Sequence, residues 1–179
     1  LTMRGTPYYF NGDELGMTNI RMDKIEDYRD MPTLNEYQHL INTGGDLKKF
    51  MSDIKLVCRD NGRTPFQWDA TANAGFTTGP PWLKVNPNYQ TINAAAAEKD
   101  PSSTLNYFRN LVKLRKQEKT LVYGKYTLLD KDNASVYAYT REWEGRKLLI
   151  VLNFKDKNAS VNLGGLDVSK AKRLQGNYA

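Results

Sequence analysis

The chain has 179 residues, 26 of them basic and 20 acidic, and it contains one cysteine and one histidine. A single cysteine excludes an internal disulfide framework and any zinc site that needs two thiolates, and a single histidine excludes metal sites with several histidines. No apolar run approaches the ~20 residues that a membrane span needs. The formal charge of +6 comes from scattered rather than clustered basic residues. We therefore predict no metal or cofactor, and neither a membrane nor a nucleic acid as partner.

The first residues contain one short apolar run. Tyr8-Tyr9-Phe10 is preceded by Gly5 and Pro7 and followed by Asn11-Gly12, a pattern that predicts one buried strand. No partner strand lies nearby in the sequence, so this strand would need a sheet that the chain does not supply. Because the chain opens at Leu1 without an initiator methionine, we expect it to be an internal part of a longer protein.

Two helices are predicted next. In residues 33–42, Thr33 and Glu36 have the spacing of a capping box, which predicts a helix start. In residues 46–58, Asp46 can cap a second helix. The apolar residues of this second helix recur with the helical period and are Leu47, Phe50, Met51, Ile54 and Val57.

Residues 59–92 break every period and are rich in glycine, proline and aromatic residues. A loop of this length is usually functional or disordered, and its aromatic content indicates an ordered excursion. We interpret its aromatic side chains as core residues, with a stacking platform for a ligand as the alternative. These residues are Phe66, Trp68, Phe76, Trp82 and Tyr89.

The last third of the sequence changes from a helical period to an alternating one. Asp100-Pro101 is predicted to open a helix that continues to about Lys119, with an acidic cap and proline in the first turn. After Gly124 the period becomes two, and short turns separate the runs, which predicts an antiparallel meander and the beginning of a β-sandwich. The predicted strands are 126–129, 135–140, 148–154 and, more weakly, 160–163.

One motif stands out for its chemistry: Arg59-Asp60-Asn61-Gly62-Arg63-Thr64-Pro65-Phe66-Gln67-Trp68-Asp69. Two arginines four residues apart flank a turn, and each guanidinium offers a fixed fork of donors suited to paired hydroxyls or a carboxylate. The simpler interpretation is an Arg–Asp pair that ties the loop to a helix, and the alternative is a ligand contact. The only histidine, His39, has no ligand spacing around it, and we interpret it as packed or solvated.

Several long motifs carry a resemblance to a known family. Gly5-Thr6-Pro7-Tyr8-Tyr9-Phe10-Asn11-Gly12-Asp13-Glu14-Leu15-Gly16-Met17-Thr18-Asn19 resembles the eighth barrel strand and following loop of the α-amylase superfamily, glycoside hydrolase family 13. More specifically, it is similar to the oligo-1,6-glucosidase and α-glucosidase branch. Residues 59–69, 73–77, 81–89 and 111–116 continue the pattern of that branch in the right order.

The resemblance implies an α+β fragment with two parts. Residues 1–119 would be the end of a (β/α)8 TIM barrel, comprising its last strand, a long helical and aromatic loop and the closing helix. Residues 120–179 would form an antiparallel β-sandwich C-terminal domain. Because residues 174–179 resemble the penultimate segment of that domain, we expect its final strand to be missing.

The resemblance also suggests roles for individual residues. Arg59 would bind the outer hydroxyls of a terminal glucose, and Arg63 would lie in the same pocket wall. Asp13 and Glu14 match an acidic pair that follows strand eight, and with Asp60 they are expected to organise the loops without touching the substrate.

The reaction implied by the resemblance needs residues that this chain lacks. The family cleaves glycosidic bonds with an aspartate nucleophile and a glutamic acid/base on other barrel strands, which we expect upstream of Leu1. No catalytic residue is therefore assigned. Pro32 stands where relatives commonly carry a glutamate near the leaving sugar, so a preference for α-1,6 bonds is not implied.

We therefore expect part of a retaining α-glucosidase that acts on terminal α-glucosidic bonds of short oligosaccharides, inactive as 179 residues alone. Its partner would be the oligosaccharide, the fragment would associate through exposed barrel surface, and the cytoplasm is favoured as location. Three alternatives remain open: a sucrose isomerase or trehalulose synthase, a non-catalytic interaction protein such as an amino-acid-transporter heavy-chain ectodomain, and a separate carbohydrate-binding module.

Overall fold

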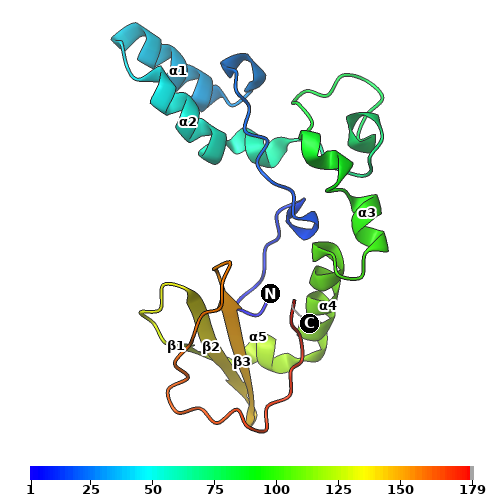
Figure 1. Cartoon of the computed structure of the whole chain (residues 1–179), viewed down its shortest axis with the longest axis vertical. Coiled ribbons are helices and arrows are strands. Elements are labelled where there is room, and N and C mark those ends of the chain that lie inside the picture. Colours follow the sequence, from blue (N-terminus) through cyan, green and yellow to red (C-terminus); the bar gives the residue numbers. More distant parts are fainter. Residues whose placement is uncertain (178–179) are drawn as a thin grey trace. The chain divides into compact units, whose positions relative to one another are not determined.

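A computed structural model describes residues 1–177 and divides the chain into two compact units (Figure 1). One unit joins Leu1–Tyr9 to the chain from Tyr107 onward, and the other comprises Phe10–Asn106. Within residues 1–177, no helix combines the length and hydrophobicity that crossing a bilayer requires.

In the unit of residues 10–106, helix α1 spans Met31–Thr43 and begins two residues earlier than predicted. Its N-cap is Asp30, whose side chain accepts a hydrogen bond from the backbone N–H of Thr33, and Pro32 occupies the first turn. The predicted capping box at Thr33 and Glu36 is therefore wrong. Proline fits the first turn of a helix, where its missing N–H costs nothing, so the helix extends back to the acidic cap.

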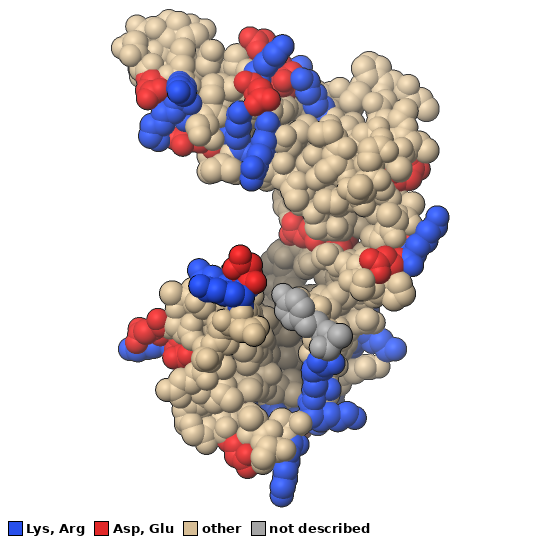
Figure 2. All heavy atoms as spheres, viewed as in Figure 1, with Lys and Arg blue, Asp and Glu red and all other residues tan. Residues whose placement is uncertain are grey.

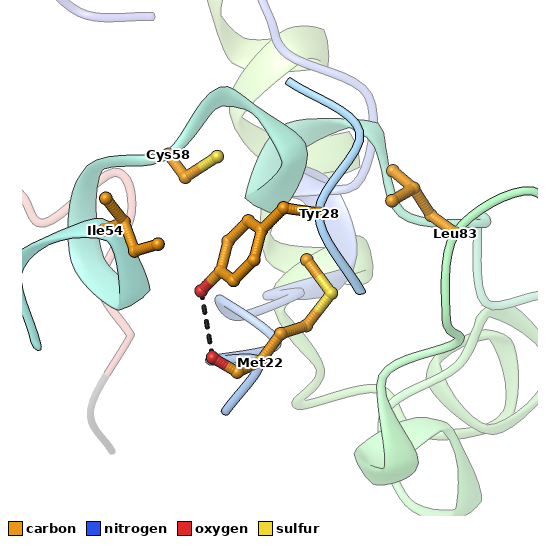
Figure 3. Packing of buried hydrophobic residues seen from close by; sticks show 5 residues of the cluster. All are labelled: Met22, Tyr28, Ile54, Cys58 and Leu83. Atoms are coloured by element: carbon orange, nitrogen blue, oxygen red, sulfur yellow. Dashed lines mark hydrogen bonds between the residues drawn. The ribbon is translucent and has the colours of Figure 1, made fainter. Parts of the chain in front are cut away.

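Helix α2, Leu47–Val57, begins as predicted, with the Asp46 side chain accepting from the N–H of Lys49. It contributes Ile54 to a buried cluster in which the Tyr28 hydroxyl donates a 2.9 Å hydrogen bond to the carbonyl of Met22 (Figure 3). Cys58 and Leu83 complete this cluster. The long loop thus shares a core with α2, because Leu83 lies within the predicted excursion.

The excursion is ordered, as predicted, but its core is not aromatic. It contains short 3-10 turns at Arg59–Arg63 and Pro87–Gln90 and, at Ala72–Gly75, a turn in which Asn73 and Ala74 are left-handed. A short helix, α3 (Ala94–Lys99), follows. Ala74, Leu83 and Gln67 are buried instead, and the Gln67 amide donates to the Asn88 side chain and to the Ile92 carbonyl.

Three of the aromatic side chains of the excursion are largely exposed in this chain. Trp68, Phe76 and Trp82 keep 54%, 46% and 55% of their surface accessible. The interpretation of these three as core residues is therefore wrong. Ala74, Leu83 and Gln67 fill the interior of the loop and leave these three rings on its surface, whereas Phe66 and Tyr89 are half-buried.

The predicted helix 100–119 is two helices, α4 (Thr104–Gln117), which begins in the unit of residues 10–106 and continues into the other, and α5 (Lys119–Tyr123). The helix does not begin at Pro101, because the Asp100 carboxylate closes a turn on the N–H and hydroxyl of Ser102. Ser103 caps α4 instead, accepting from the N–H of Asn106.

Three strands follow in an antiparallel sheet of order β1-β2-β3: Lys125–Leu129, Val136–Trp143 and Arg146–Asn153. The register pairs Thr127 with Thr140 and Tyr139 with Ile150. The predicted meander is confirmed for these strands, whereas residues 160–163 form no strand. Residues 174–177 are also irregular, and the rest of the predicted penultimate segment, 178–179, lies outside the described residues.

The predicted strand at residues 8–10 is absent from the described structure. Tyr8 is 93% exposed and Phe10 59%, while the Tyr9 ring packs on Phe108 with centroids 4.2 Å apart. A strand needs a hydrogen-bonded neighbour, and none of the described strands pairs with residues 8–10. The prediction of a buried strand is wrong for this chain, although the expected lack of a partner sheet explains why.

Two arginines hold the first residues against the sheet and helices of the same unit. Arg141, fully buried in β2, donates to the carbonyls of Gly124 and Thr2. Arg115 of α4 donates to the carbonyls of Leu1, Met3 and Gly5. Residues 1–5 are thus fixed through their backbone and not by a strand ladder.

Candidate functional site

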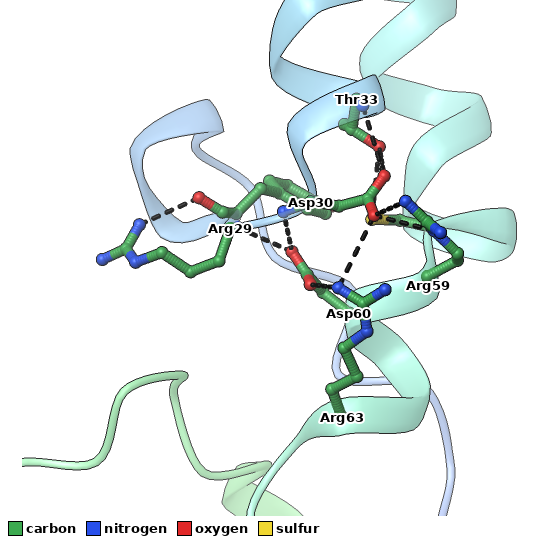
Figure 4. A network of polar contacts seen from close by, with 8 residues as sticks. Arg29, Asp30, Thr33, Arg59, Asp60 and Arg63 are labelled. Carbon is green, nitrogen blue, oxygen red and sulfur yellow. Dashed lines mark hydrogen bonds and ion pairs between the residues drawn. The ribbon is translucent and has the colours of Figure 1, made fainter.

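The two arginines of the motif lie beside the start of α1, where two buried carboxylates meet them (Figure 4). One residue, Cys58, separates the end of α2 from the turn Arg59–Arg63. Asp60 is fully buried, and its Oδ2 accepts hydrogen bonds from the backbone N–H groups of Arg29 at 2.6 Å and Asp30 at 2.9 Å. Asp60 therefore joins the turn to the residues that lead into α1.

Asp30 uses its two carboxylate oxygens for two different purposes. Oδ2 accepts from the N–H and the hydroxyl of Thr33, at 3.2 and 2.8 Å, and so caps α1. Oδ1 accepts from Nε of Arg59 at 2.8 Å and lies 2.6 Å from Nη2 of the same guanidinium. A single buried side chain thereby connects the helix start to an arginine of the motif.

Arg63 completes the group more loosely. Its Nη1 lies 3.6 Å from Oδ1 of Asp30 and 3.5 Å from Oδ1 of Asp60. The side chains of Arg59 and Arg63 are 60% and 38% exposed, so two partly exposed cations cover two buried anions. The expected Arg–Asp pairing of loop and helix is confirmed.

The environment of Asp30 favours its ionised form. Burial by itself raises the pKa of Asp30, but the hydrogen bonds from Thr33 and Arg59 outweigh burial and hold that pKa below its ordinary value. The carboxylate is therefore charged at neutral pH, and its pairing with Arg59 persists there.

The acidic pair after the N-terminal run forms a turn of its own. Asp13–Leu15 is a single 3-10 turn, and Oε2 of Glu14 accepts from the N–H of Gly12 at 2.9 Å. Asp13 is exposed, and its carbonyl accepts from the N–H of Gly16. The structure thus brings Arg59, Arg63 and Asp60 together, whereas Asp13 and Glu14 belong to a separate turn.

Asp30 is the residue of this group that sequence reasoning missed. The available signal was its place two residues before Pro32, which is the spacing of an acidic N-cap followed by proline in the first turn. Asp30 contacts Arg59, 29 positions away in the chain, and no local sequence pattern predicts a contact at that separation.

The described part of the chain shows no metal-binding cluster. Among residues 1–177, no three histidine, cysteine or acidic side chains converge as metal ligands would. His39 is exposed on α1, as the interpretation of a solvated residue required. On the face in view in Figure 2, basic side chains are interspersed with acidic ones.

Both parts of the chain match models of known protein families. Residues 1–124 match the model of the alpha amylase catalytic domain, and residues 126–179 match that of the maltogenic amylase C-terminal domain. The chain therefore belongs to the alpha-amylase family, and its three-stranded antiparallel sheet is consistent with the C-terminal domain of that fold. The resemblance inferred from the motifs is confirmed.

Particular relatives are similar along most of the chain. The oligo-1,6-glucosidases of Parageobacillus thermoglucosidasius and Bacillus cereus are 46% and 43% identical, over 96% and 98% of the chain and 31% and 32% of the relatives. The trehalose-6-phosphate hydrolase of Escherichia coli is 44% identical over 84% of the chain and 27% of its own length. The chain thus spans about a third of the length of the curated relatives it matches.

Solved structures of such enzymes match the fold. The trehalose-6-phosphate hydrolase of Bacillus licheniformis has a TM-score of 0.92 and 40% identity, covering 99% of this chain and 32% of that one. A trehalulose synthase variant, A258V, in complex with Tris has a TM-score of 0.84 and 49% identity, covering 87% and 28%.

Proposed function

We propose that the chain is part of a retaining α-glucosidase of the oligo-1,6-glucosidase type, which hydrolyses terminal α-glucosidic bonds of short oligosaccharides. The observation that carries this proposal is the 40–47% identity to several oligo-1,6-glucosidases over most of the chain. In this proposal, residues 1–119 complete a (β/α)8 barrel with its last strand, its long loop and its closing helix. Residues 120–179 form a β-sandwich C-terminal domain.

The proposed contribution of this chain is substrate binding. Arg59 would donate to adjacent hydroxyls of the terminal glucose, and Arg63 would line the same wall. Support comes from the partial exposure of both guanidinium groups above buried carboxylates, since a guanidinium anchored in place presents its remaining donors in a fixed plane. Asp60 would support the wall by joining its backbone to α1, while Asp13 and Glu14 organise their own turn.

The bond-breaking groups belong, in this proposal, to parts of the protein outside these 179 residues. A retaining mechanism needs a carboxylate nucleophile and a second carboxyl group as acid and base, about 5–5.5 Å apart. The 179-residue polypeptide alone should therefore give no turnover of an aryl α-glucoside above a buffer blank at any pH. Turnover in a preparation free of host enzymes would contradict this assignment.

A second candidate is a sucrose isomerase, such as a trehalulose synthase. It is favoured by the 49% identity to trehalulose synthase structures over 87% of the chain, which is slightly above the 47% identity to an oligo-1,6-glucosidase over 85% of the chain. Both candidates begin with transfer of a glucosyl group, and they differ in whether water or the released fructose receives it.

Product analysis of the full-length protein separates the candidates. We expect isomaltose to be hydrolysed to glucose, and sucrose to give glucose and fructose without a rearranged disaccharide. Trehalulose or isomaltulose as the main product from sucrose would favour the second candidate. Hydrolysis confined to trehalose 6-phosphate would overturn both, and would move the protein to the third group of relatives.

A further inference from the structure

Asp30 makes more contacts than a helix cap requires. An N-cap needs one oxygen that accepts from the first turn, and serine, threonine or asparagine supplies it as well as aspartate does. Oδ2 of Asp30 satisfies that need alone through Thr33. The second oxygen and the negative charge are additional to capping, and both face Arg59 and Arg63.

The cap of the neighbouring helix gives an internal comparison. Asp46 caps α2 through a 2.9 Å bond from the N–H of Lys49, and its side chain is exposed to solvent. Asp30, in contrast, is only 3% exposed and sits under an arginine of the motif. The same residue type in the same local position thus has a second set of partners in one helix and not in the other.

We infer that Asp30 is a positioning residue for substrate binding, which fixes the direction of the Arg59 guanidinium before a sugar arrives. The inference rests on the proposed binding role of Arg59. Oδ1 contacts the edge of the guanidinium that carries Nε and Nη2. Within residues 1–177, Nη1 makes no hydrogen bond, so its donors remain for the hydroxyls of a ligand.

A positioning role explains the contact of Asp30 with Arg59 better than a contribution to stability does. An ion pair with a partner that is mostly in water contributes little to stability, and Arg59 is 60% exposed. A long flexible side chain that must be ordered on binding weakens affinity, and anchoring it in advance removes that cost. Asp60 extends the anchor, because its bonds to the N–H groups of Arg29 and Asp30 fix the backbone that carries the Asp30 carboxylate.

The test uses the full-length enzyme and an aryl α-glucoside, with Asp30→Asn as the main variant. Asparagine keeps an acceptor for Thr33 but loses the charge that holds Arg59. We expect KM to rise about tenfold, the effect of losing one charge-assisted hydrogen bond, with kcat nearly unchanged. Asp46→Asn is the matched control, and its KM should equal that of the wild type.

A double-variant cycle shows whether Asp30 acts through Arg59. Arg59→Ala should raise KM, and adding Asp30→Asn to it should raise KM no further. If Arg59→Ala raises KM while Asp30→Asn leaves it unchanged, or if the two effects simply add, the positioning role is wrong and the binding role of Arg59 stands. If Arg59→Ala leaves KM unchanged, the proposed binding role fails instead. Asp30→Ser, which also keeps a cap for Thr33, replaces Asp30→Asn if the latter does not fold.

Discussion

Arg141 donates a 2.8 Å hydrogen bond to the carbonyl oxygen of Thr2, which lies 139 positions earlier in the chain. The guanidinium is fully buried, and burial lowers the pKa of Arg141 from its ordinary value. Its described partners are backbone carbonyls of Thr2, Val122 and Gly124, so this buried charge is balanced by peptide dipoles.

Replacing Arg141 by methionine should lower the free energy of unfolding by about 3 kcal/mol, because it leaves several buried carbonyls without donors. Urea denaturation followed by the fluorescence of the sheet tryptophan, Trp143, would measure the loss. Arg146→Met is the control on the next strand, because its partner is Glu118 and its side chain is 56% exposed. The control should change stability by less than about 1 kcal/mol. Equal losses in both variants would contradict the importance of the buried contacts.

Gly124, which ends α5, leaves no space for a side chain. A Cβ there would lie 2.3 Å from the carbonyl oxygen of Thr120 and 3.1 Å from the backbone nitrogen of Glu142. Since both neighbours are backbone atoms, Gly124→Ala should destabilise the protein by about 3 kcal/mol, the upper range for overpacking. Gly79→Ala is the control, because a Cβ there meets only the Thr77 hydroxyl at 3.9 Å. A thermal melt that places both variants within a degree of the wild type would refute this prediction.

The lowered pKa of Asp30 predicts an acid-sensitive contribution to stability. The pKa of Asp30 is lower in the folded protein than in the unfolded chain, where it is near the ordinary 3.8. Such a carboxyl group stabilises the folded protein at pH values above its unfolded pKa. This contribution is lost as the pH falls through the folded pKa. The wild-type melting temperature should therefore drop more steeply below about pH 4 than that of Asp30→Asn. Parallel melting curves for the two proteins from pH 7 to pH 3 would show that Asp30 makes no such contribution.

The exposed run at residues 8–10 should make the isolated polypeptide associate. Tyr8 and Phe10 place large rings in solvent, and adjacent exposed apolar side chains favour self-association. Light scattering after size-exclusion chromatography should give a mass above one chain that falls in the variant Tyr8→Ser with Phe10→Ser. Val168→Ser removes a single exposed apolar side chain elsewhere and should leave the mass unchanged. A monomeric wild type at micromolar concentration would be the contrary result.

Local patterns predicted the elements whose stabilising contacts are local. Asp46 gives the start of α2, and alternation gives the three strands. The apolar period of α2 gives Ile54 on its buried face, but it is wrong at Val57, which is 76% exposed at the end of the helix. The run at residues 8–10 has an equally clear strand pattern, yet it forms no strand, because no segment among residues 1–177 pairs with it. The pattern records the environment a segment is suited to, and the structure depends on whether that environment is present.

Part of the candidate site could be predicted from the sequence, because some of its residues are neighbours in the chain. The sequence shows Arg59 and Arg63 as two arginines on either side of a predicted turn, and Asp60 lies between them in the same motif. Asp30 was hidden, because its partner Arg59 is 29 positions away and because the capping-box spacing of later residues suggested a different helix start. Contacts between distant residues require the fold, since no periodicity encodes them.

The unit that contains the sheet uses both ends of the sequence, and this has a consequence during synthesis. At about 5–20 residues per second, a ribosome needs roughly 7 to 28 s to travel the 139 positions from Thr2 to Arg141. The carbonyls of Leu1, Met3 and Gly5 can meet their donor, Arg115, before the end of that interval, whereas the carbonyl of Thr2 must wait for Arg141. The docking of residues 1–5 therefore cannot be complete until β2 has been made, although these residues are synthesised before the rest of the unit.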